Sequence, residues 1–251
     1  MPVNPAIPLG IIACDVLEFE VKARLQRLGL QSRALRFLEM GKHDTPDILR
    51  KDLQAVIDEL EQLGCRRLLF VYGLCSNSIL GLTAKRAEMV FPRAHDCITL
   101  FLGSRERYAE IHKREPGTYW FTPGWCRGQR VPGADYFDRL EARYREKFED
   151  EEDVEYLMEM EREKYAHYNV AAYTDLGDGP VEESRSQTVE AAKALEMEYR
   201  NHEGDDGLLV RLLAGPWDAE EFLVIPPGKT ARYAPDSRVI RCGDCPGCAN
   251  D

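Results

Sequence analysis

The segment RLLFVYGLCSNS, residues 67–78, decides the fold class of this chain. Its first part is a short apolar run, which is typical of a strand buried on both faces of a parallel sheet. After this run, Gly73 and Cys75 are followed by three short polar residues at positions 76–78. Loops and helix N-termini gather at the carboxyl ends of parallel strands, so this ending predicts a site there.

Strands and amphipathic helices alternate on both sides of this segment. PLGIIACD (8–15) and ALRFLE (34–39) are predicted strands, and each is followed by a helical pattern. AEMVFP (87–92) is a predicted fourth strand, with helical patterns after it. This alternation predicts an α/β fold with a mainly parallel sheet and helices on both faces.

The later part of the chain predicts a smaller C-terminal α/β lobe. TYWFTP (118–123) is a predicted strand, and one long helix or a helical pair is expected from Asp135 to Tyr168. Further on, LLVRLL (208–213) and FLVIPPG (222–228) are predicted strands. The expected divisions are a main lobe with a helical extension (1–168), the smaller lobe (169–240) and a Cys-rich tail (241–251).

Composition and charge exclude several classes of partner. The formal net charge of −11 argues against nucleic acid and anionic membranes, which require clustered Lys and Arg. The acidic run 148–163 is expected to be the solvated face of a helix. No apolar stretch approaches membrane-spanning length and no signal peptide is evident, so a cytoplasmic location is expected. In that reducing compartment the 8 cysteines are core residues, reactive thiols or metal ligands rather than disulfides.

Two cysteines stand at the carboxyl ends of predicted strands. Cys14 ends IIAC and Cys75 follows FVYGL, so neighbouring strands would bring both thiols to one edge of the sheet. Each cysteine alone is also compatible with a small buried hydrophobe. The polar residues after Cys75, with Gly73 allowing close backbone approach, favour a site.

A third candidate segment is FPRAHDCITLFLGSRERY, residues 91–108. Cys97 stands at the entrance to an apolar helix, where backbone N–H groups favour an anion or a thiolate. The alternative is that Asp96 or His95 caps this helix and that Cys97 lies in the core. We expect Cys14, Cys75 and Cys97 to converge as metal ligands. The residues expected to face the same cavity and bind a small molecule are Asn77, His95, Asp96 and Arg105.

The C-terminal sequence RCGDCPGCAND contains the most specific spacing in the chain. Cys242, Cys245 and Cys248 form a CxxCxxC run, which can fold successive thiolates around one ion or cluster. The rival interpretation is an exposed redox-active tail. Only three ligands are available in this run, so a metal would need a fourth from the body, a partner subunit or a substrate.

Five segments of this chain together resemble the DUF1638 family of uncharacterised prokaryotic proteins. They are IIACDVL, VYGLCSNSILGL, FPRAHDCITLFLGSRERY, PGTYWFTPGW and LLAGPWDAEEFLVIPPG, within about residues 8–230. The resemblance implies that Cys14, Cys75 and Cys97 lie in the family's recognised blocks. It also implies an association with anaerobic one-carbon metabolism built on corrinoid methyltransferases. The CxxCxxC tail has no place in the general family pattern.

These observations favour a metal-binding protein that acts on a small molecule at the strand ends. Thiolates select zinc or iron–sulfur centres over Mg²⁺ or Ca²⁺, so the expected cofactor is a 4Fe–4S cluster or zinc. Three thiols from separate loops would be similar in geometry to the cluster sites of quinolinate synthase and the diphthamide enzymes. Such a protein would be an enzyme or an accessory, with a small-molecule substrate and corrinoid methyltransferase components as partners.

Two other functions remain open from the sequence. One is a binding or metal-delivery protein that uses the CxxCxxC tail as its carrier, and the other is a structural partner in a methyltransferase complex. Nucleic acid and membrane are not expected as partners, and a homo-oligomer is left open.

Overall fold

The computed structural model describes residues 7–127, 131–133 and 135–243 and divides the chain into two compact units. Unit 1 consists of residues 1–108 and 204–251, and unit 2 consists of residues 109–203. This division differs from the expected boundaries after residues 168 and 240. The difference arises because the strand at residues 222–225 pairs with the first sheet, and the hairpin after it packs on that sheet.

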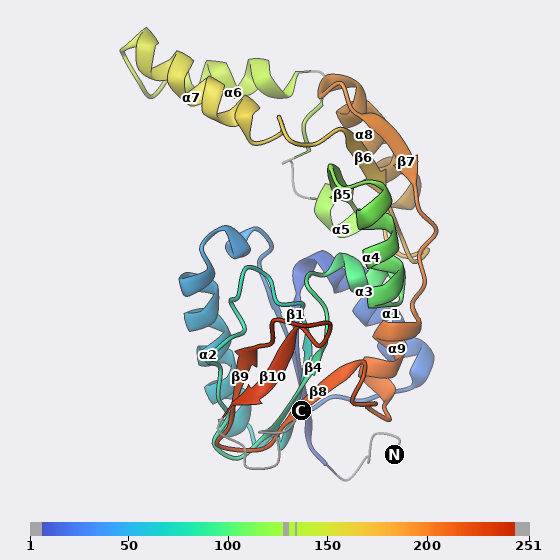
Figure 1. The fold of residues 1–251 in the computed structure, drawn as a ribbon. Helices are drawn as coiled ribbons and strands as arrows, with labels where there is room; N and C mark the ends of the chain where they lie inside the picture. Colours follow the sequence, from blue (N-terminus) through green and yellow to red (C-terminus); the bar gives the residue numbers. More distant parts are fainter. Residues whose placement is uncertain (1–6, 128–130, 134, 244–251) are drawn as a thin grey trace. The chain divides into compact units, whose positions relative to one another are not determined.

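A five-stranded sheet forms the centre of unit 1, in the order β2-β1-β3-β4-β8 (Figure 1). The first four strands pair in parallel, and β8 pairs with β4 in the antiparallel direction. The strands are β1 (Leu9–Cys14), β2 (Ala34–Leu38), β3 (Arg67–Val71), β4 (Glu88–Pro92) and β8 (Phe222–Ile225). The predicted α/β class with a mainly parallel sheet is confirmed.

Helices cover both faces of this sheet (Figure 1). On one face lies α2 (Pro46–Gln62), whose buried side chains recur at helical spacing and pack against β1, β3 and β4. The rings of Phe70 and Phe91 stack in this layer with their centroids 4.1 Å apart. On the other face, α9 (Gly207–Ala214) contacts β3 and β4 and packs beside α1 (Glu18–Leu28). Successive side chains of each buried strand point to opposite faces of the sheet, so the same strands contribute to the apolar layer on each face.

The strand predicted over residues 208–213 is wrong, because this segment forms α9. Leu208, Leu209, Leu212 and Leu213 are buried, whereas Arg211 is exposed. Burial at i, i+1, i+4 and i+5 follows the period of a helix, and a six-residue apolar run does not reveal that period clearly.

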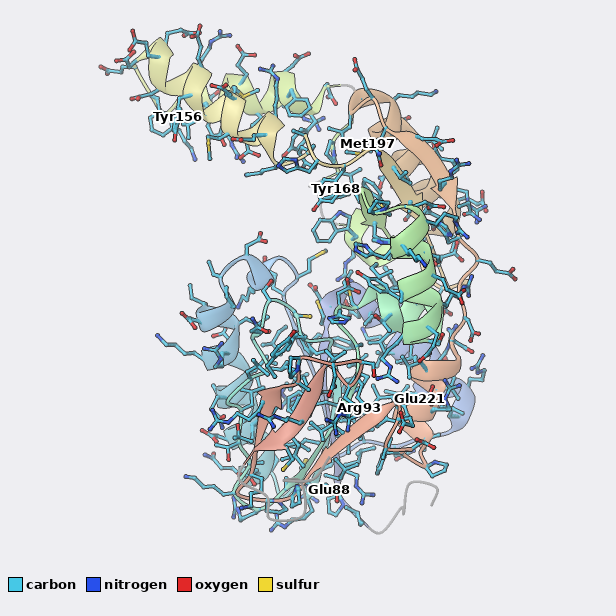
Figure 2. The ribbon with its side chains drawn as sticks, in the orientation of Figure 1. Glu88, Arg93, Tyr156, Tyr168, Met197 and Glu221 are labelled. Atoms are coloured by element: carbon cyan, nitrogen blue, oxygen red, sulfur yellow. The ribbon has the colours of Figure 1, made fainter. Side chains whose placement is uncertain are left out.

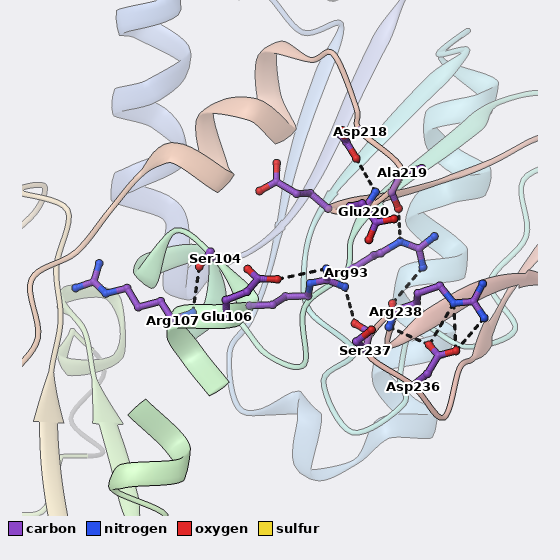
Figure 3. Close-up of polar contacts among 12 residues, drawn as sticks. Arg93, Ser104, Glu106, Arg107, Asp218, Ala219, Glu220, Asp236, Ser237 and Arg238 are labelled. Carbon is purple, nitrogen blue, oxygen red and sulfur yellow. Dashed lines mark hydrogen bonds and ion pairs between the residues drawn. The ribbon is translucent and has the colours of Figure 1, made fainter. Parts of the chain in front are cut away.

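A C-terminal hairpin packs on the α2 side of the sheet. It consists of antiparallel β9 (Thr230–Tyr233) and β10 (Ile240–Gly243), and Ala231, Ile240 and Cys242 enter the core there. Buried Arg93 fixes this segment by donating hydrogen bonds to carbonyl oxygens (Figure 3). Its acceptors are the oxygens of Ala219 at 2.8 Å, Arg238 at 3.1 Å and Ile240.

Unit 2 contains a three-stranded parallel sheet in the order β5-β6-β7. Its elements are β5 (Thr118–Phe121), α5 (Pro123–Cys126), β6 (Val170–Tyr173), α8 (Val181–Ala194) and β7 (Glu198–Asn201). Phe121, Tyr173 and Met197 form its core with small residues of α8. Helix α4 (Arg105–Arg114) begins in unit 1 and leads the chain into unit 2.

A helical hairpin interrupts the sheet of unit 2 between β5 and β6. Its helices are α6 (Tyr136–Arg145) and α7 (Glu151–Glu163), so the helical pair expected over residues 135–168 is present. Leu140, Val154 and Met158 form a small core of their own, covered by three aromatic side chains from α6.

No helix within the described ranges combines the length and the apolar character that crossing a membrane requires.

Candidate functional site

The candidate site lies at the carboxyl edge of the unit 1 sheet. The chain leaves β1 toward β2 on one side and returns to form β3 on the other side of β1, so the strand order reverses between β1 and β3. Such reversals open a crevice at the strand ends in parallel sheets. Cys14 is the last residue of β1, Cys75 follows β3, and Cys97 follows β4 and precedes α3 (Ile98–Leu102). We call these three residues the thiol cluster.

The segment after β3 has an unusual backbone. Cys75, Ser76 and Asn77 have φ values of 44°, 55° and 67°, so three consecutive residues other than glycine occupy the left-handed region. Each such residue costs about 1–2 kcal/mol, and strain of this kind persists only where surrounding structure enforces it. Strained backbone clusters at functional sites, which makes this turn a strong structural signal.

Hydrogen bonds from neighbouring segments hold this left-handed turn. The N–H groups of Leu74 and Cys75 donate to the carbonyl oxygens of Ala94 and His95, at 2.8 Å and 3.1 Å. From α2, Arg50 donates to the carbonyl oxygen of Asn77 at 3.0 Å. The turn is therefore fastened both to the segment that carries Cys97 and to a helix.

Gly73 brings these two segments into direct backbone contact. A Cβ atom added at Gly73 would lie 2.5 Å from the Cα atom of Asp96, closer than real Cβ contacts come. Only glycine fits this approach, which places the thiols of Cys75 and Cys97 at the same edge.

The three thiols lie close enough to affect one another's ionisation. Burial raises the pKa of the Cys75 thiol well above its ordinary value, and the charges of Cys14 and Asp96 raise it further. The pKa of Cys97 is also raised, first by burial and then by Asp96, Cys14 and Cys75. Each of the three cysteines keeps part of its surface exposed.

Burial and acidic neighbours are the main causes of the raised pKa of Cys75 and Cys97. Among the described residues, none of the main groups that shift the pKa of Cys75 or Cys97 is a lysine or an arginine. The raised pKa favours the protonated form of Cys75 and Cys97, and binding of a cation would favour their thiolates.

Tyr72 and Asp96 are the main polar neighbours of the thiol cluster. The buried Tyr72 hydroxyl makes no hydrogen bond of ordinary geometry with the described residues. Burial is the largest cause of its raised pKa, and the charges of Cys14, Cys75 and Asp15 raise the pKa further. The hydroxyl therefore keeps its proton. The Asp15 carboxylate accepts from the N–H of Met40 at 2.7 Å.

The Asp96 carboxyl is held in place by two kinds of donor. Its Oδ1 accepts from the N–H of Ile98 at 3.0 Å, and its Oδ2 accepts from the Tyr108 hydroxyl at 2.7 Å. Burial raises the pKa of Asp96 although these hydrogen bonds and His95 act to lower it. Asp96 therefore caps the start of α3, as the sequence allowed. The same carboxyl also raises the pKa of Cys75 and Cys97.

The other predicted binding residues are distributed differently. Asn77 and His95 are exposed at the rim, beside Cys75 and Asp96. Arg105 donates to the carbonyl oxygen of Ser237 and pairs with Glu106 at 3.5 Å, so its guanidinium is engaged with the loop between β9 and β10. Sequence reasoning did not select Tyr72, Asp15 or Tyr108, although Tyr72 follows the buried strand directly and could have been noticed there.

The tail cysteines are separate from this edge as far as they are described. Cys242 is buried in β10 and its thiol donates to the carbonyl oxygen of Gly243, while Cys245 and Cys248 lie outside the described residues. β10 starts beside Arg93, near the carboxyl end of β4, and ends opposite Thr230. Thr230 in turn bridges to Thr83 before β4, so the chain reaches Gly243 at the amino edge of the sheet.

A cavity of about 480 Å³ lies elsewhere, in unit 2. Most of its charged side chains are exposed and already paired, Arg114 with Glu115 at 3.1 Å and Arg200 with Glu198 at 2.7 Å. Its lining residues are Arg114, Glu115, Pro116, Asn169, Val170, Glu198 and Arg200.

A family model described as "Protein of unknown function (DUF1638)" matches residues 37–213. The chain belongs to the DUF1638 family. The predicted resemblance is thereby confirmed, and the matched part of this DUF1638 chain contains Cys75 and Cys97. Comparison with curated proteins and with solved structures gives no match.

In the described part of the DUF1638 chain, no three His, Cys, Asp or Glu side chains have the geometry of a complete metal site. The donor chemistry nevertheless fits a soft metal, because three partly exposed thiols share one edge with two carboxyl groups.

Proposed function

We propose that Cys14, Cys75 and Cys97 bind a 4Fe–4S cluster or zinc, beside a small-molecule site at the carboxyl edge of the unit 1 sheet. The observation that carries this proposal is that three segments bring three thiols to one edge of the sheet, where they affect one another's pKa. A lone buried cysteine needs no ligand, but three adjacent thiols with Asp96 beside them form a strongly negative group once deprotonated. A bound cation would stabilise that group.

The strained turn supports the proposal independently. Without a function, three left-handed residues in succession would be a persistent loss of stability. The turn fixes the backbone of Cys75 against His95, and it thereby presents this thiol next to Cys97. Cys75 would thus be held in place before metal binds.

The polar groups beside the thiols would bind the small molecule. Tyr72 supplies a buried hydroxyl beside Cys14, which would donate to a substrate oxygen or nitrogen. Asp96, held by Tyr108 and the start of α3, supplies a fixed acceptor or proton carrier. Asp96 acts on both Cys75 and Cys97, so a neutral or cationic molecule suits the site better than a phosphate.

Three thiolates leave one position of a tetrahedral zinc ion, or one iron of a cluster, open to substrate. A bound metal would supply Lewis-acid activation there. The chain's own residues would orient the substrate and hold a proton at Asp96. The family resemblance supports placing this enzyme or accessory in anaerobic one-carbon metabolism, alongside corrinoid methyltransferases.

Anaerobic purification with metal analysis and an absorption spectrum tests the proposal directly. We expect iron with broad visible absorption, or zinc in a colourless protein. Substituting Cys14, Cys75 or Cys97 by Ser should lower metal content at least about tenfold, since even loss of a group that only orients a ligand costs that much. Cys126→Ser is the matched control, because Cys126 is a buried thiol in the core of unit 2.

Proton release gives a second readout that does not depend on activity. Zinc titrated into the metal-free protein should release about two to three protons per ion from the thiols at neutral pH. A protein that takes up neither zinc nor iron, or that loses metal equally in the Cys126→Ser variant, would overturn the proposal. A disulfide between two of the three cysteines after anaerobic purification would favour redox sensing instead.

A further inference from the structure

The outer face of α7 in unit 2 carries two large apolar side chains that the described residues leave exposed. Tyr156 is 62% exposed and Met160 is 43% exposed, one helical turn apart. The opposite face of α7, with Val154 and Met158, is buried against α6. Tyr156 is marked on α7 in Figure 2. A helix that already buries one apolar face within its own hairpin gains nothing in stability from a second exposed one.

Acidic side chains surround this apolar pair. Residues 147–163 contain nine acidic side chains and two basic ones. Glu152, Glu159 and Glu163 fall on the same face as Tyr156 at the period of a helix, and Asp153 lies beside Met160. None of these four carboxylates forms a side-chain ion pair or hydrogen bond with another described residue, whereas Glu151 and Glu161 of the same helix are paired with Arg145 and Lys164.

The charges decide which kind of partner fits this face. Nucleic acid and anionic lipid surfaces are repelled by it, and a second copy of the same face would bring like charges together. A helix with its own apolar stripe and flanking Lys or Arg complements both features, since its apolar residues would cover Tyr156 and Met160. Tyr and Met are also residue types that are enriched at protein interfaces.

We propose that the outer face of α7, consisting of Glu152, Asp153, Tyr156, Glu159, Met160 and Glu163, docks a basic amphipathic helix of a partner protein. The added helix would lie along α7 and complete a three-helix arrangement with α6. This surface is independent of the thiol cluster.

Designed peptides test this proposal on the full-length protein. The probe is a labelled peptide of 13 residues, the length of α7, with Leu at helical spacing and Lys elsewhere. Its control peptides are a scrambled sequence of the same composition and a Leu–Glu version. We expect saturable binding of the Leu–Lys helix, measured by fluorescence anisotropy, at least about tenfold tighter than either control.

Variants locate the binding surface. Tyr156→Ala with Met160→Ala should weaken binding at least about tenfold, whereas Ile48→Ala with Tyr233→Ala should leave it unchanged. The latter pair is 52% and 50% exposed and lies in unit 1. Glu152→Lys with Glu159→Lys should reverse the preference toward the Leu–Glu peptide. All these side chains are exposed, so the variants should fold normally.

Three outcomes would overturn the proposal. One is equal binding of the helical and scrambled Leu–Lys peptides, which would indicate charge attraction alone. Another is binding that survives the Tyr156→Ala, Met160→Ala variant. The third is concentration-dependent dimerisation abolished by that variant, which would make a second copy of this chain the occupant of the face.

Discussion

At Gly73, the absence of a side chain lets two backbone segments touch. The same contact fixes Cys75 and Asp96 relative to each other, so one residue type determines both packing and the geometry of the thiol cluster. This position combines a role in stability with a role in the proposed site.

Gly73→Ala should therefore be destabilising. The added methyl group meets the Asp96 backbone at 2.5 Å, which a side-chain rotation cannot relieve. We expect a loss of about 1–3 kcal/mol in the free energy of unfolding, measured by urea denaturation, together with reduced metal content. Gly133→Ala is the control, because the nearest contact of its added methyl group among the described residues is Asp135 at 3.9 Å. Equal stabilities of the two variants would show that the segments separate easily.

Asp96 should make stability depend on pH. Burial raises its pKa in the folded protein above the ordinary value of 3.8, so the folded state holds this proton more tightly than the unfolded state. The contribution is complete below pH 3.8 and is lost as the pH rises through the raised pKa.

Asp96→Asn removes this dependence while keeping an acceptor for the N–H of Ile98. In metal-free protein, the stability of the variant relative to wild type should increase as the pH rises from about 4 to 7. Urea unfolding at several pH values measures it. A constant difference across that range would mean that the pKa of Asp96 is the same in both states.

At the scale of elements, the left-handed turn at residues 75–77 stores strain. Ser76→Gly should relieve part of it, because the exposed Ser76 side chain makes the φ of 55° costly and glycine does not. We expect a gain of about 0.5–1 kcal/mol in the free energy of unfolding, since the greater backbone entropy of unfolded glycine offsets some of the relief.

Ser186→Gly is the control for this substitution. Ser186 is exposed within α8, where glycine lowers helix stability by about 0.5–1 kcal/mol. The two substitutions should thus have opposite signs, and a loss of stability in Ser76→Gly would argue against a strained turn.

The elements most easily predicted from the sequence are those with long, regular patterns. The first three strands, with α1 and α2, follow from alternation of buried runs and helical periods. The six-residue segment at 208–213 was assigned wrongly, because Leu208 to Leu213 are almost all apolar. The pairing of β8 with β4, across more than 120 residues, has no local signal in either strand.

In the site, too, features set by neighbouring residues could be predicted from the sequence, whereas contacts between distant segments could not. Strand ends mark Cys14 and Cys75 in the sequence, since each follows an apolar run. The contact of Tyr108 with Asp96 depends on how the start of α4 packs, and the left-handed backbone at Ser76 depends on hydrogen bonds from other segments. Neither leaves a pattern in the sequence.

At the scale of the whole molecule, the position of β10 bears on the role of the tail. Gly243 lies at the amino edge of the sheet and the thiol cluster lies at the carboxyl edge. Truncation after Gly243 should therefore leave the metal content of the thiol cluster and the melting temperature unchanged. Metal analysis and thermal unfolding of the shortened chain measure both.

Truncation after Ser237 is the contrasting experiment. It removes β10 and two carbonyl acceptors of buried Arg93, so we expect a clear loss of stability. If truncation after Gly243 removed bound metal, the tail would be a ligand set shared with the body or a metal carrier in its own right.

The division of the chain into a continuous unit 2 and a discontinuous unit 1 has a consequence during synthesis on the ribosome. Unit 2 is complete once residue 203 has emerged, whereas unit 1 waits for β8 and for the acceptors of Arg93 at residues 219, 238 and 240. Domains generally fold as units as they emerge from the ribosome. The sheet begun by the first part of the chain would therefore be completed only when β8 is made. All three thiols of the cluster are made by residue 97, well before the last strand that closes their sheet. A nascent chain would therefore expose these cysteines to oxidants in the cell until translation is nearly finished.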